Sequence, residues 1–246
     1  MDEFAPINID YVNLGIETGF IPKINYIGFL YYTIMHQFAR TNLKLHYPNT
    51  KYSFAISPYV WASECNIAAC TTENTIGDLP ALRNFVNDQN DYIGVGHYPN
   101  AAQYFHYNFG SDQEIFADGP NGWNATLNYI DTYAKSFTPN KSIAIMDTGI
   151  SSNTVTITSP ISITIAGSEE HISQWTYDLG TNAIKENYLF INWWNSVDYD
   201  PIWITSGSPE ATSIWVHMGL WGLDMNMTPP VLKEKDGLCT WRKVFQ

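Results

Sequence analysis

The feature that most restricts the fold of this 246-residue chain is its alternation of short β-rich runs with amphipathic helical stretches. Strand, helix, strand in this order predicts parallel strands joined by helical crossovers. The stretch at 154–167 alternates with a period of two and predicts an inserted hairpin, with Pro160 near its turn. Strands are predicted at 11–20, 52–61, 91–100, 142–150 and 187–198, and helices at 25–47, 79–90, 123–137 and about 168–185.

Two of the predicted helices have a recognisable apolar face. In the first, Pro48 lies beyond the end of the helix. The helix at 123–137 carries Leu127, Ile130, Tyr133 and Ala134 on one side. The apolar positions of the first helix that approximate helical spacing are Ile27, Leu30, Tyr31, Ile34, Phe38 and Leu45.

Polar and aromatic residues gather where each predicted strand ends. A buried parallel strand is normally apolar along its length, so such residues indicate contact with solvent or a ligand. Parallel α/β folds, and (β/α)8 barrels in particular, place their active sites at the carboxyl ends of the strands. We therefore expect one shared mouth formed by Glu17, Tyr59 to Trp61, His97 to Pro99, Asp147 and Trp193 to Asp198.

Composition excludes some partners. With 24 acidic and 12 basic side chains the net charge is -12, which repels a phosphate backbone, so no nucleic-acid partner is expected. The longest apolar stretch, 26–35, is shorter than the roughly 20 residues that span a bilayer, and no membrane partner is expected. No linker-like segment divides the chain, which predicts a single domain over 1–246.

The compartment is inferred indirectly. The start of the chain lacks the apolar region of a signal peptide. Abundant tyrosine and tryptophan, few lysines and N-x-S/T triplets at Asn124, Asn140 and Asn226 suit a secreted or extracytoplasmic carbohydrate-active protein. An extracytoplasmic location is therefore the expectation.

The three cysteines do not form a metal site by spacing. Cys65 and Cys70 lie five residues apart, and a loop disulfide and two free thiols are equally compatible with that spacing. Cys239 is expected to be a buried lone thiol. The histidines show no paired metal-ligand spacing, and no nucleotide-binding loop, G-x-S-x-G elbow or H-E-x-x-H motif occurs. No metal or cofactor is expected.

The strand-end motifs carry a family resemblance. "NLGIETG", "AISPYVW", "YIGVGHYP", "IAIMDTG" and "FINWWNSVD", followed by "MGLWGLDMNMTPP", resemble strands four to eight of a retaining glycoside hydrolase of clan A, with endo-galactanases the most similar. The resemblance covers essentially the whole chain and rests on the order and spacing of the motifs. It implies a (β/α)8 TIM barrel that lacks its first three βα units in this chain.

The resemblance also implies roles for individual residues. Glu17 takes the position of the acid/base, Asp147 that of the nucleophile, Tyr98 that of an aromatic near the nucleophile, and Trp193 or Trp194 that of a platform for a sugar ring. Two carboxylates about 5 to 5.5 Å apart are what a retaining mechanism requires. Adjacent tryptophans on a strand point to opposite sides, so only one can face the mouth.

Two residues depart from the clan pattern. The clan usually has Asn before the acid/base and Glu as the nucleophile, whereas this chain has Ile16 and the shorter Asp147. A carboxylate withdrawn by roughly 1 Å can cost about a hundredfold in rate. The departures make a catalytically impaired carbohydrate-binding pseudoenzyme the alternative to a glycosidase. An acyl or phosphoryl hydrolase is a further rival.

The expected substrate contacts are Tyr59, Trp61, His97, Tyr98, Trp193, Trp194 and Asp198. A lone histidine in a packed barrel mouth is more often simply hydrogen-bonded there, which is the alternative for His97. The expected partner is a carbohydrate substrate. Because five strands leave a barrel incomplete, a preceding segment or a second chain is expected to supply three more βα units. The chain alone is expected to expose apolar surface.

Overall fold

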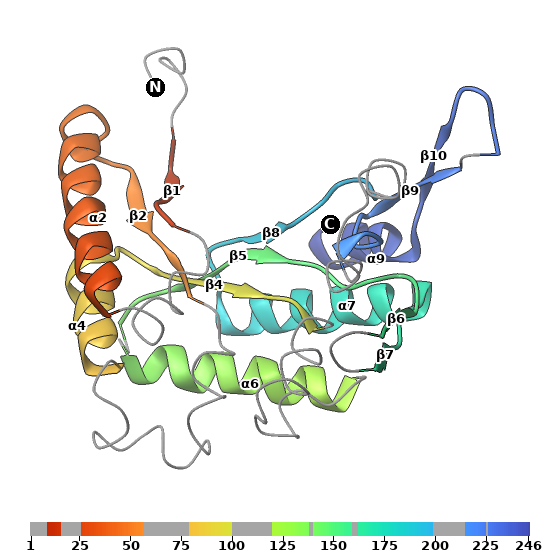
Figure 1. Cartoon of the computed structure of the whole chain (residues 1–246), viewed down its shortest axis with the longest axis horizontal. Coiled ribbons are helices and arrows are strands. Elements are labelled where there is room, and N and C mark those ends of the chain that lie inside the picture. The colour runs from red at the N-terminus through yellow and green to blue at the C-terminus, as the bar shows by residue number, and fades with distance from the viewer. Residues whose placement is uncertain are drawn as a thin grey trace.

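A computed structural model describes residues 9–15, 26–56, 79–99, 120–137, 140–158, 162–198, 215–224 and 226–246 of the chain (Figure 1). The elements in chain order are β1 (Tyr11–Asn13), α2 (Tyr26–His46), β2 (Lys51–Ser53), β3 (Ala55–Ile56), α4 (Leu79–Gln89), β4 (Ile93–His97), α6 (Pro120–Phe137), β5 (Ile143–Thr148), β6 (Val155–Ile157), β7 (Ile163–Ile165), α7 (Glu169–Glu186), β8 (Ile191–Trp193), β9 (Trp221–Asp224), β10 (Val231–Glu234) and α9 (Asp236–Phe245).

Five parallel segments lie side by side in the order of the chain. β1 pairs with β2, and β3, which follows β2 after Phe54, begins a sheet of order β3-β4-β5-β8. A backbone hydrogen bond of 2.8 Å from Ala55 N to Gly15 O continues the pairing of the first two segments. The predicted parallel arrangement is therefore confirmed, with helices α2, α4, α6 and α7 between successive strands.

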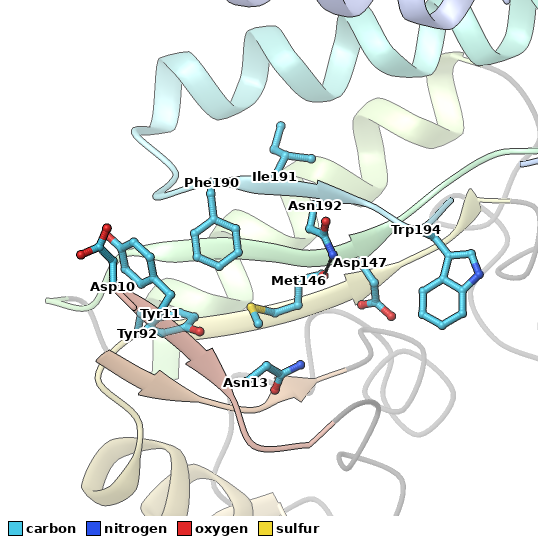
Figure 2. Close-up of a pocket in the computed structure, with 10 residues that line it drawn as sticks. All are labelled: Asp10, Tyr11, Asn13, Tyr92, Met146, Asp147, Phe190, Ile191, Asn192 and Trp194. Atoms are coloured by element: carbon cyan, nitrogen blue, oxygen red, sulfur yellow. Dashed lines mark hydrogen bonds between the residues drawn. The ribbon is translucent and has the colours of Figure 1, made fainter. Parts of the chain in front are cut away.

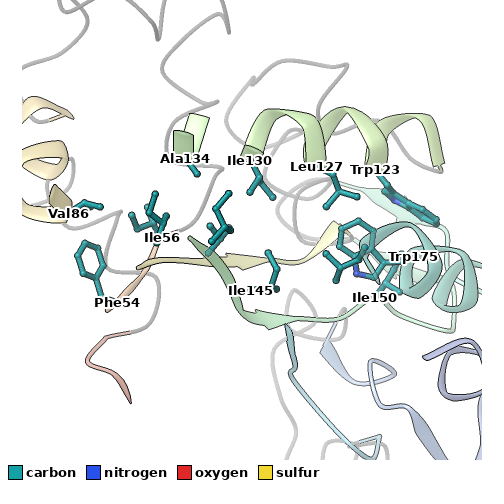
Figure 3. Packing of buried hydrophobic residues seen from close by; sticks show 14 of the residues in the cluster. Phe54, Ile56, Val86, Trp123, Leu127, Ile130, Ala134, Ile145, Ile150 and Trp175 are labelled. Atoms are coloured by element: carbon teal, nitrogen blue, oxygen red, sulfur yellow. The ribbon is translucent and has the colours of Figure 1, made fainter. Parts of the chain in front are cut away.

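The main core lies between this sheet and its helices (Figure 3). Alternate residues of β4 and β5, such as Val95 and Ile145, point to the helix side. The predicted inner face of α6 is confirmed at Leu127, Ile130 and Ala134, which are all buried. Trp175 of α7 is fully buried against the same cluster, so the helix layer covers this side of the sheet.

The connection between β5 and α7 contains the predicted hairpin. β6 and β7 pair antiparallel, with Thr156 opposite Thr164. α7 then begins at Ser168, whose side chain accepts a hydrogen bond from His171 N at 3.0 Å, and ends at Asn187 in the left-handed conformation. The prediction of a helix at about 168–185 is thus confirmed to within a residue.

The apolar face predicted for the first helix points to solvent instead of the sheet. Phe29 and His36 of α2 are buried and Tyr32 packs partly buried beside them. An apolar face normally covers a core. The predicted face, however, is exposed at Ile27, Leu30, Tyr31, Ile34, Phe38 and Leu45.

The elements after β8 follow from weaker signals in the sequence. β9 and β10 form an antiparallel hairpin that projects from the molecule in Figure 1, and α9 packs on α7. Gly237 and Leu238 of α9 face inward, and a Cβ on Gly237 would lie 2.9 Å from Ile172 Cγ1. Cys239 therefore faces outward and is exposed, so the prediction of a buried thiol is wrong. In the described part of the chain, no helix has the length and apolar character needed to cross a membrane.

Candidate active site

A pocket of about 590 Å³ lies on the side of the sheet opposite the helices (Figure 2). The carboxyl end of the strands contributes Asp147 and Trp194, and the opposite end contributes an aromatic group of Tyr11, Tyr92 and Phe190. The complete lining is Asp10, Tyr11, Asn13, Tyr92, Met146, Asp147, Phe190, Ile191, Asn192 and Trp194.

A bulge in β5 directs Asp147 into this pocket. Val95 of β4 pairs with Ile145, and the next residue, Gly96, pairs with Asp147, so Met146 is the extra residue. Strict alternation would place Asp147 on the helix side with Ile145, because neighbouring side chains of a strand point to opposite faces. The extra residue reverses this, and both Met146 and Asp147 line the pocket.

Two neighbours from β4 and its end fix the Asp147 carboxylate. The Tyr98 hydroxyl donates a hydrogen bond of 3.0 Å to Asp147 Oδ2, and both residues are buried. On the other side, Gly96 leaves room for Asp147, since a Cβ there would collide with Oδ1. Asp147 is 4% exposed, so its carboxylate is held by its surroundings instead of moving in solvent.

The two adjacent tryptophans point to opposite sides of β8, as a strand requires. Trp194 lines the pocket, is 41% exposed, and lies 6.2 Å from the Tyr98 ring between centroids. Trp193 packs against Trp241 of α9 and donates from Nε1 to Met218 O at 2.7 Å. Of the pair, Trp194 is therefore the residue beside Asp147.

The structure adds one pocket residue, Asn192, and one neighbour of Tyr98, Trp215, that the strand-end pattern missed. Asn192 Nδ2 donates a hydrogen bond of 3.0 Å to the carbonyl oxygen of Met146, the extra residue of the bulge. Trp215 contacts Tyr98 edge to face with centroids 4.7 Å apart and packs against the β6–β7 cluster. Asn192 could be found from period-two alternation with Trp194, whereas Trp215 gave no local signal.

His97 and Asp198 lie outside the pocket. His97 is fully buried on the helix side, edge to face with Trp175 at 5.3 Å, and burial lowers its pKa to about 3 because the imidazolium is disfavoured there. The carboxylate of Asp198 accepts from Lys235 Nζ at 2.6 Å and from Gly219 N at 2.8 Å. In the described structure His97 thus packs against Trp175, whereas Asp198 forms an ion pair with Lys235 and a hydrogen bond with Gly219.

Lys235 completes a buried polar cluster with Asp198. Its ammonium also donates to Ser152 Oγ at 2.9 Å and to His217 O at 3.1 Å. The cluster joins the end of β10 to the segments after β5 and before β9. It is separate from the pocket lining.

The remaining predicted site residues, Glu17, Tyr59 and Trp61, lie outside the described residues, as do Cys65 and Cys70. The separation of the two carboxylates therefore stays a prediction. Within the described ranges, no group of three or more His, Cys, Asp or Glu side chains could hold a metal ion.

Comparison with solved structures identifies the fold. No protein-family model and no curated protein matches the sequence. An endo-laminarinase from Formosa Hel1_33_131 aligns with a TM-score of 0.50 and 16% identity over 90% of this chain and 56% of its own. The Ignisphaera aggregans GH53 catalytic domain aligns with a TM-score of 0.51 and 14% identity over 96% of this chain and 59% of its own.

An active-site mutant of Rhizomucor miehei beta-1,3-glucanosyltransferase in complex with laminaritriose aligns with a TM-score of 0.51 and 13% identity. The alignment covers 87% of this chain and 60% of that structure. The chain thus spans between 56 and 60% of the length of these three structures. They do not single out the endo-galactanases. The chain has a mixed α/β fold that is similar to part of the barrels of these three structures.

Proposed function

We propose that the chain forms the catalytic side of a glycoside hydrolase that cleaves O-glycosidic bonds of a poly- or oligosaccharide by a retaining mechanism. One observation carries the proposal: the buried Asp147 carboxylate accepts a hydrogen bond of 3.0 Å from the Tyr98 hydroxyl and lies in the same pocket as the exposed ring of Trp194. A fixed carboxylate next to an exposed aromatic plane is suited to attack on a stacked sugar.

In the proposed reaction Asp147 and Glu17 divide the work. Asp147 attacks the anomeric carbon while the bond to the leaving oxygen breaks and Glu17 gives that oxygen its proton. Glu17 then takes a proton from water, and the water oxygen displaces Asp147 from the anomeric carbon. Trp194 would stack on the C–H face of a sugar ring. Tyr59 and Trp61 remain proposed substrate contacts.

The alternative is a carbohydrate-binding protein without turnover. It is favoured by the side chain at position 147, which is one methylene shorter than Glu and is drawn toward Tyr98. If Asp147 stops short of the anomeric carbon, the pocket would bind a sugar without forming a covalent intermediate.

Three further βα units, supplied by a preceding segment or by a second polypeptide, are proposed to complete the barrel and to close the pocket. The coverage of 56 to 60% of the similar structures supports this size of complement. An extracytoplasmic location is also part of the proposal.

The test is turnover of aryl glycosides and of oligosaccharides including laminaritriose, the sugar bound in one similar structure. We expect Glu17→Gln and Asp147→Asn to abolish hydrolysis and Asp147→Glu to retain or increase it. Binding of the sugar by calorimetry, with no turnover by the unmodified chain or by Asp147→Glu after the barrel has been completed, would establish the pseudoenzyme. Unchanged hydrolysis in Glu17→Gln would contradict the proposed acid/base.

Substitution at the two tryptophans separates recognition from packing. Trp194→Ala should weaken sugar binding at least tenfold with little loss of thermal stability, because its ring is exposed beside the pocket. The matched control, Trp193→Ala, should mainly lower thermal stability, because that ring packs against Trp241. Equal effects of both substitutions on binding would contradict the platform role of Trp194.

A further inference from the structure

The outer side of α2 carries a second apolar face that none of the described residues covers. We call this face the outer stripe and define it as Ile27, Tyr31, Ile34, Phe38, Thr41 and Leu45. Its apolar members are between 62 and 76% exposed. At 3.6 residues per turn the stripe lies roughly half a turn from the inward side chains of Phe29 and His36. A helix that is apolar on both sides is normally buried on both sides.

The spacing of the outer stripe is that of a coiled-coil seam. Successive members are separated by four, three, four, three and four residues, so they occupy alternating a and d positions over three heptads. Such a seam fits another α-helix, because each side chain inserts between four residues of the facing helix.

The outer stripe is also symmetric about residue 36. Ile34 and Phe38 are each two residues from this centre, and Ile27 and Leu45 are each nine residues from it. Tyr31 and Thr41 are each five residues away. Two copies of α2 running antiparallel across a two-fold axis would therefore bring each member opposite its counterpart. A self-complementary patch of this kind is what a two-fold dimer requires.

Charge on α2 permits this pairing although the whole chain carries a net charge of -12. Residues 26–46 contain no Asp or Glu. The two cations, Arg40 and Lys44, are paired with Asp91 at 2.6 and 3.2 Å. The face is thus nearly neutral although the whole chain is acidic, so two copies meet little charge repulsion along it.

The area is sufficient for a stable dimer. The apolar members of the outer stripe, with the neighbouring exposed side chains of Leu30 and Met35, each expose roughly 100 Å². Covering them in two copies would bury about 1,400 Å², within the standard size of a specific interface. We propose that α2 pairs antiparallel with α2 of a second copy of this chain through the outer stripe.

This surface is distinct from the one that barrel completion would use. Additional βα units would pair with the edge of the sheet and pack beside α2, because neighbouring helices of a barrel lie around one ring. The outer stripe points away from that ring, and Figure 1 shows α2 at the margin of the molecule. The inference therefore does not depend on the proposed function.

The first test is the mass in solution by light scattering at about 50 μM protein. We expect twice the chain mass of 27.9 kDa. Ile34→Lys should weaken self-association at least tenfold. The matched control is Ile184→Lys on α7, because Ile184 is 60% exposed and Ile34 is 62% exposed. The control should leave the mass unchanged, and circular dichroism of both variants should match the unmodified chain.

A charge-pair rescue tests the register. Ile34 of one copy faces Phe38 of the other, so a mixture of Ile34→Lys chains with Phe38→Glu chains should recover the dimer, although each variant alone is monomeric. A monomeric unmodified chain, an equal loss with Ile184→Lys, or a mixture that stays monomeric would each overturn the proposal. A larger assembly that Ile34→Lys leaves intact would overturn it as well.

Discussion

Gly96 and Asp147 face each other across neighbouring strands, and the space for the carboxylate depends on the missing side chain at Gly96. A Cβ at Gly96 would collide with Asp147 Oδ1. Overpacking of this kind costs about 1 to 3 kcal/mol. We expect Gly96→Ala to lower the free energy of unfolding in urea by that amount and to displace Asp147 from Tyr98.

A double-mutant cycle isolates this contact. In an Asp147→Ala background the colliding oxygen is gone, so Gly96→Ala should cost much less than in the unmodified chain. Equal costs in both backgrounds would show that the strain comes from elsewhere in β4. The cycle needs no substrate and therefore does not depend on the proposed function.

His36 makes the stability of the fold depend on pH. Its ring packs against Phe85 and Phe54, with centroids 5.0 and 5.7 Å apart. Burial, with a smaller effect of Arg40, lowers the pKa of His36 from 6.5 to about 4. Between these values the unfolded chain binds a proton that the folded chain does not, so stability falls as pH decreases from 6.5 to 4.

The full effect of His36 is about 3 kcal/mol. Between pH 6.5 and 4 the free energy of unfolding should fall less steeply with decreasing pH in His36→Leu than in the unmodified chain. The two slopes should differ by about 1.4 kcal/mol per pH unit. Above pH 6.5 His36 is neutral in both the folded and the unfolded chain. The stability curves of the unmodified chain and of His36→Leu should therefore run parallel there. Parallel curves below that pH as well would contradict the low pKa of His36.

At the scale of elements, one buried ion pair connects the junction of β10 and α9 to the segment that follows β8. Lys235 and Asp198 are each 5% exposed and 2.6 Å apart. Removing one partner leaves the other charge buried and uncompensated, which costs about 3 to 5 kcal/mol. Lys235→Met should lower the free energy of unfolding by this amount in urea titrations.

Removing both charges supplies the control. In Lys235→Met with Asp198→Asn no charge is left unpaired, and the amide oxygen introduced at position 198 can still accept from Gly219 N. The double variant should regain more than half of the lost free energy. If it is no more stable than Lys235→Met alone, the ion pair is not the source of the effect.

Local patterns predicted the order of the elements well and the direction of side chains less well. Apolar residues on β4 and β5 give a clear strand signal, and the α6 face at Leu127 and Ile130 was correctly identified. On α2 the sequence is apolar on two sides, and period alone does not distinguish the side that meets the sheet. The stronger periodic signal there belongs to the outer stripe.

The site shows the same division. The position of Asp147 at a strand end was evident from the sequence, but the bulge at Met146 that turns it into the pocket depends on pairing with β4. His97 looked equivalent to Tyr98, yet alternation without a bulge places it on the helix side. Asp198 forms an ion pair with Lys235, which lies 37 residues further along the chain, and no local pattern reveals such a contact.

At the scale of the whole molecule, the two margins of the sheet differ from its centre. β4 and β5 pair on both sides and are buried throughout. Among the described strands, β1 pairs only with β2, and its residues are partly exposed. A parallel sheet is normally covered at both margins and on both faces.

Hydrogen exchange measures this difference directly. Amides of β4 and β5 should exchange only through global unfolding, because both neighbours must separate before water reaches them. Amides of β1 should exchange at least roughly a hundredfold faster, through local opening at the margin. Adding a polypeptide that supplies the proposed βα units should slow exchange in β1 by a larger factor than in β4, because it closes the margin at β1 as well as stabilising the whole fold. Protection in β1 equal to that in β4 for the isolated chain would contradict an open margin and would mean that another strand already pairs with β1 in solution.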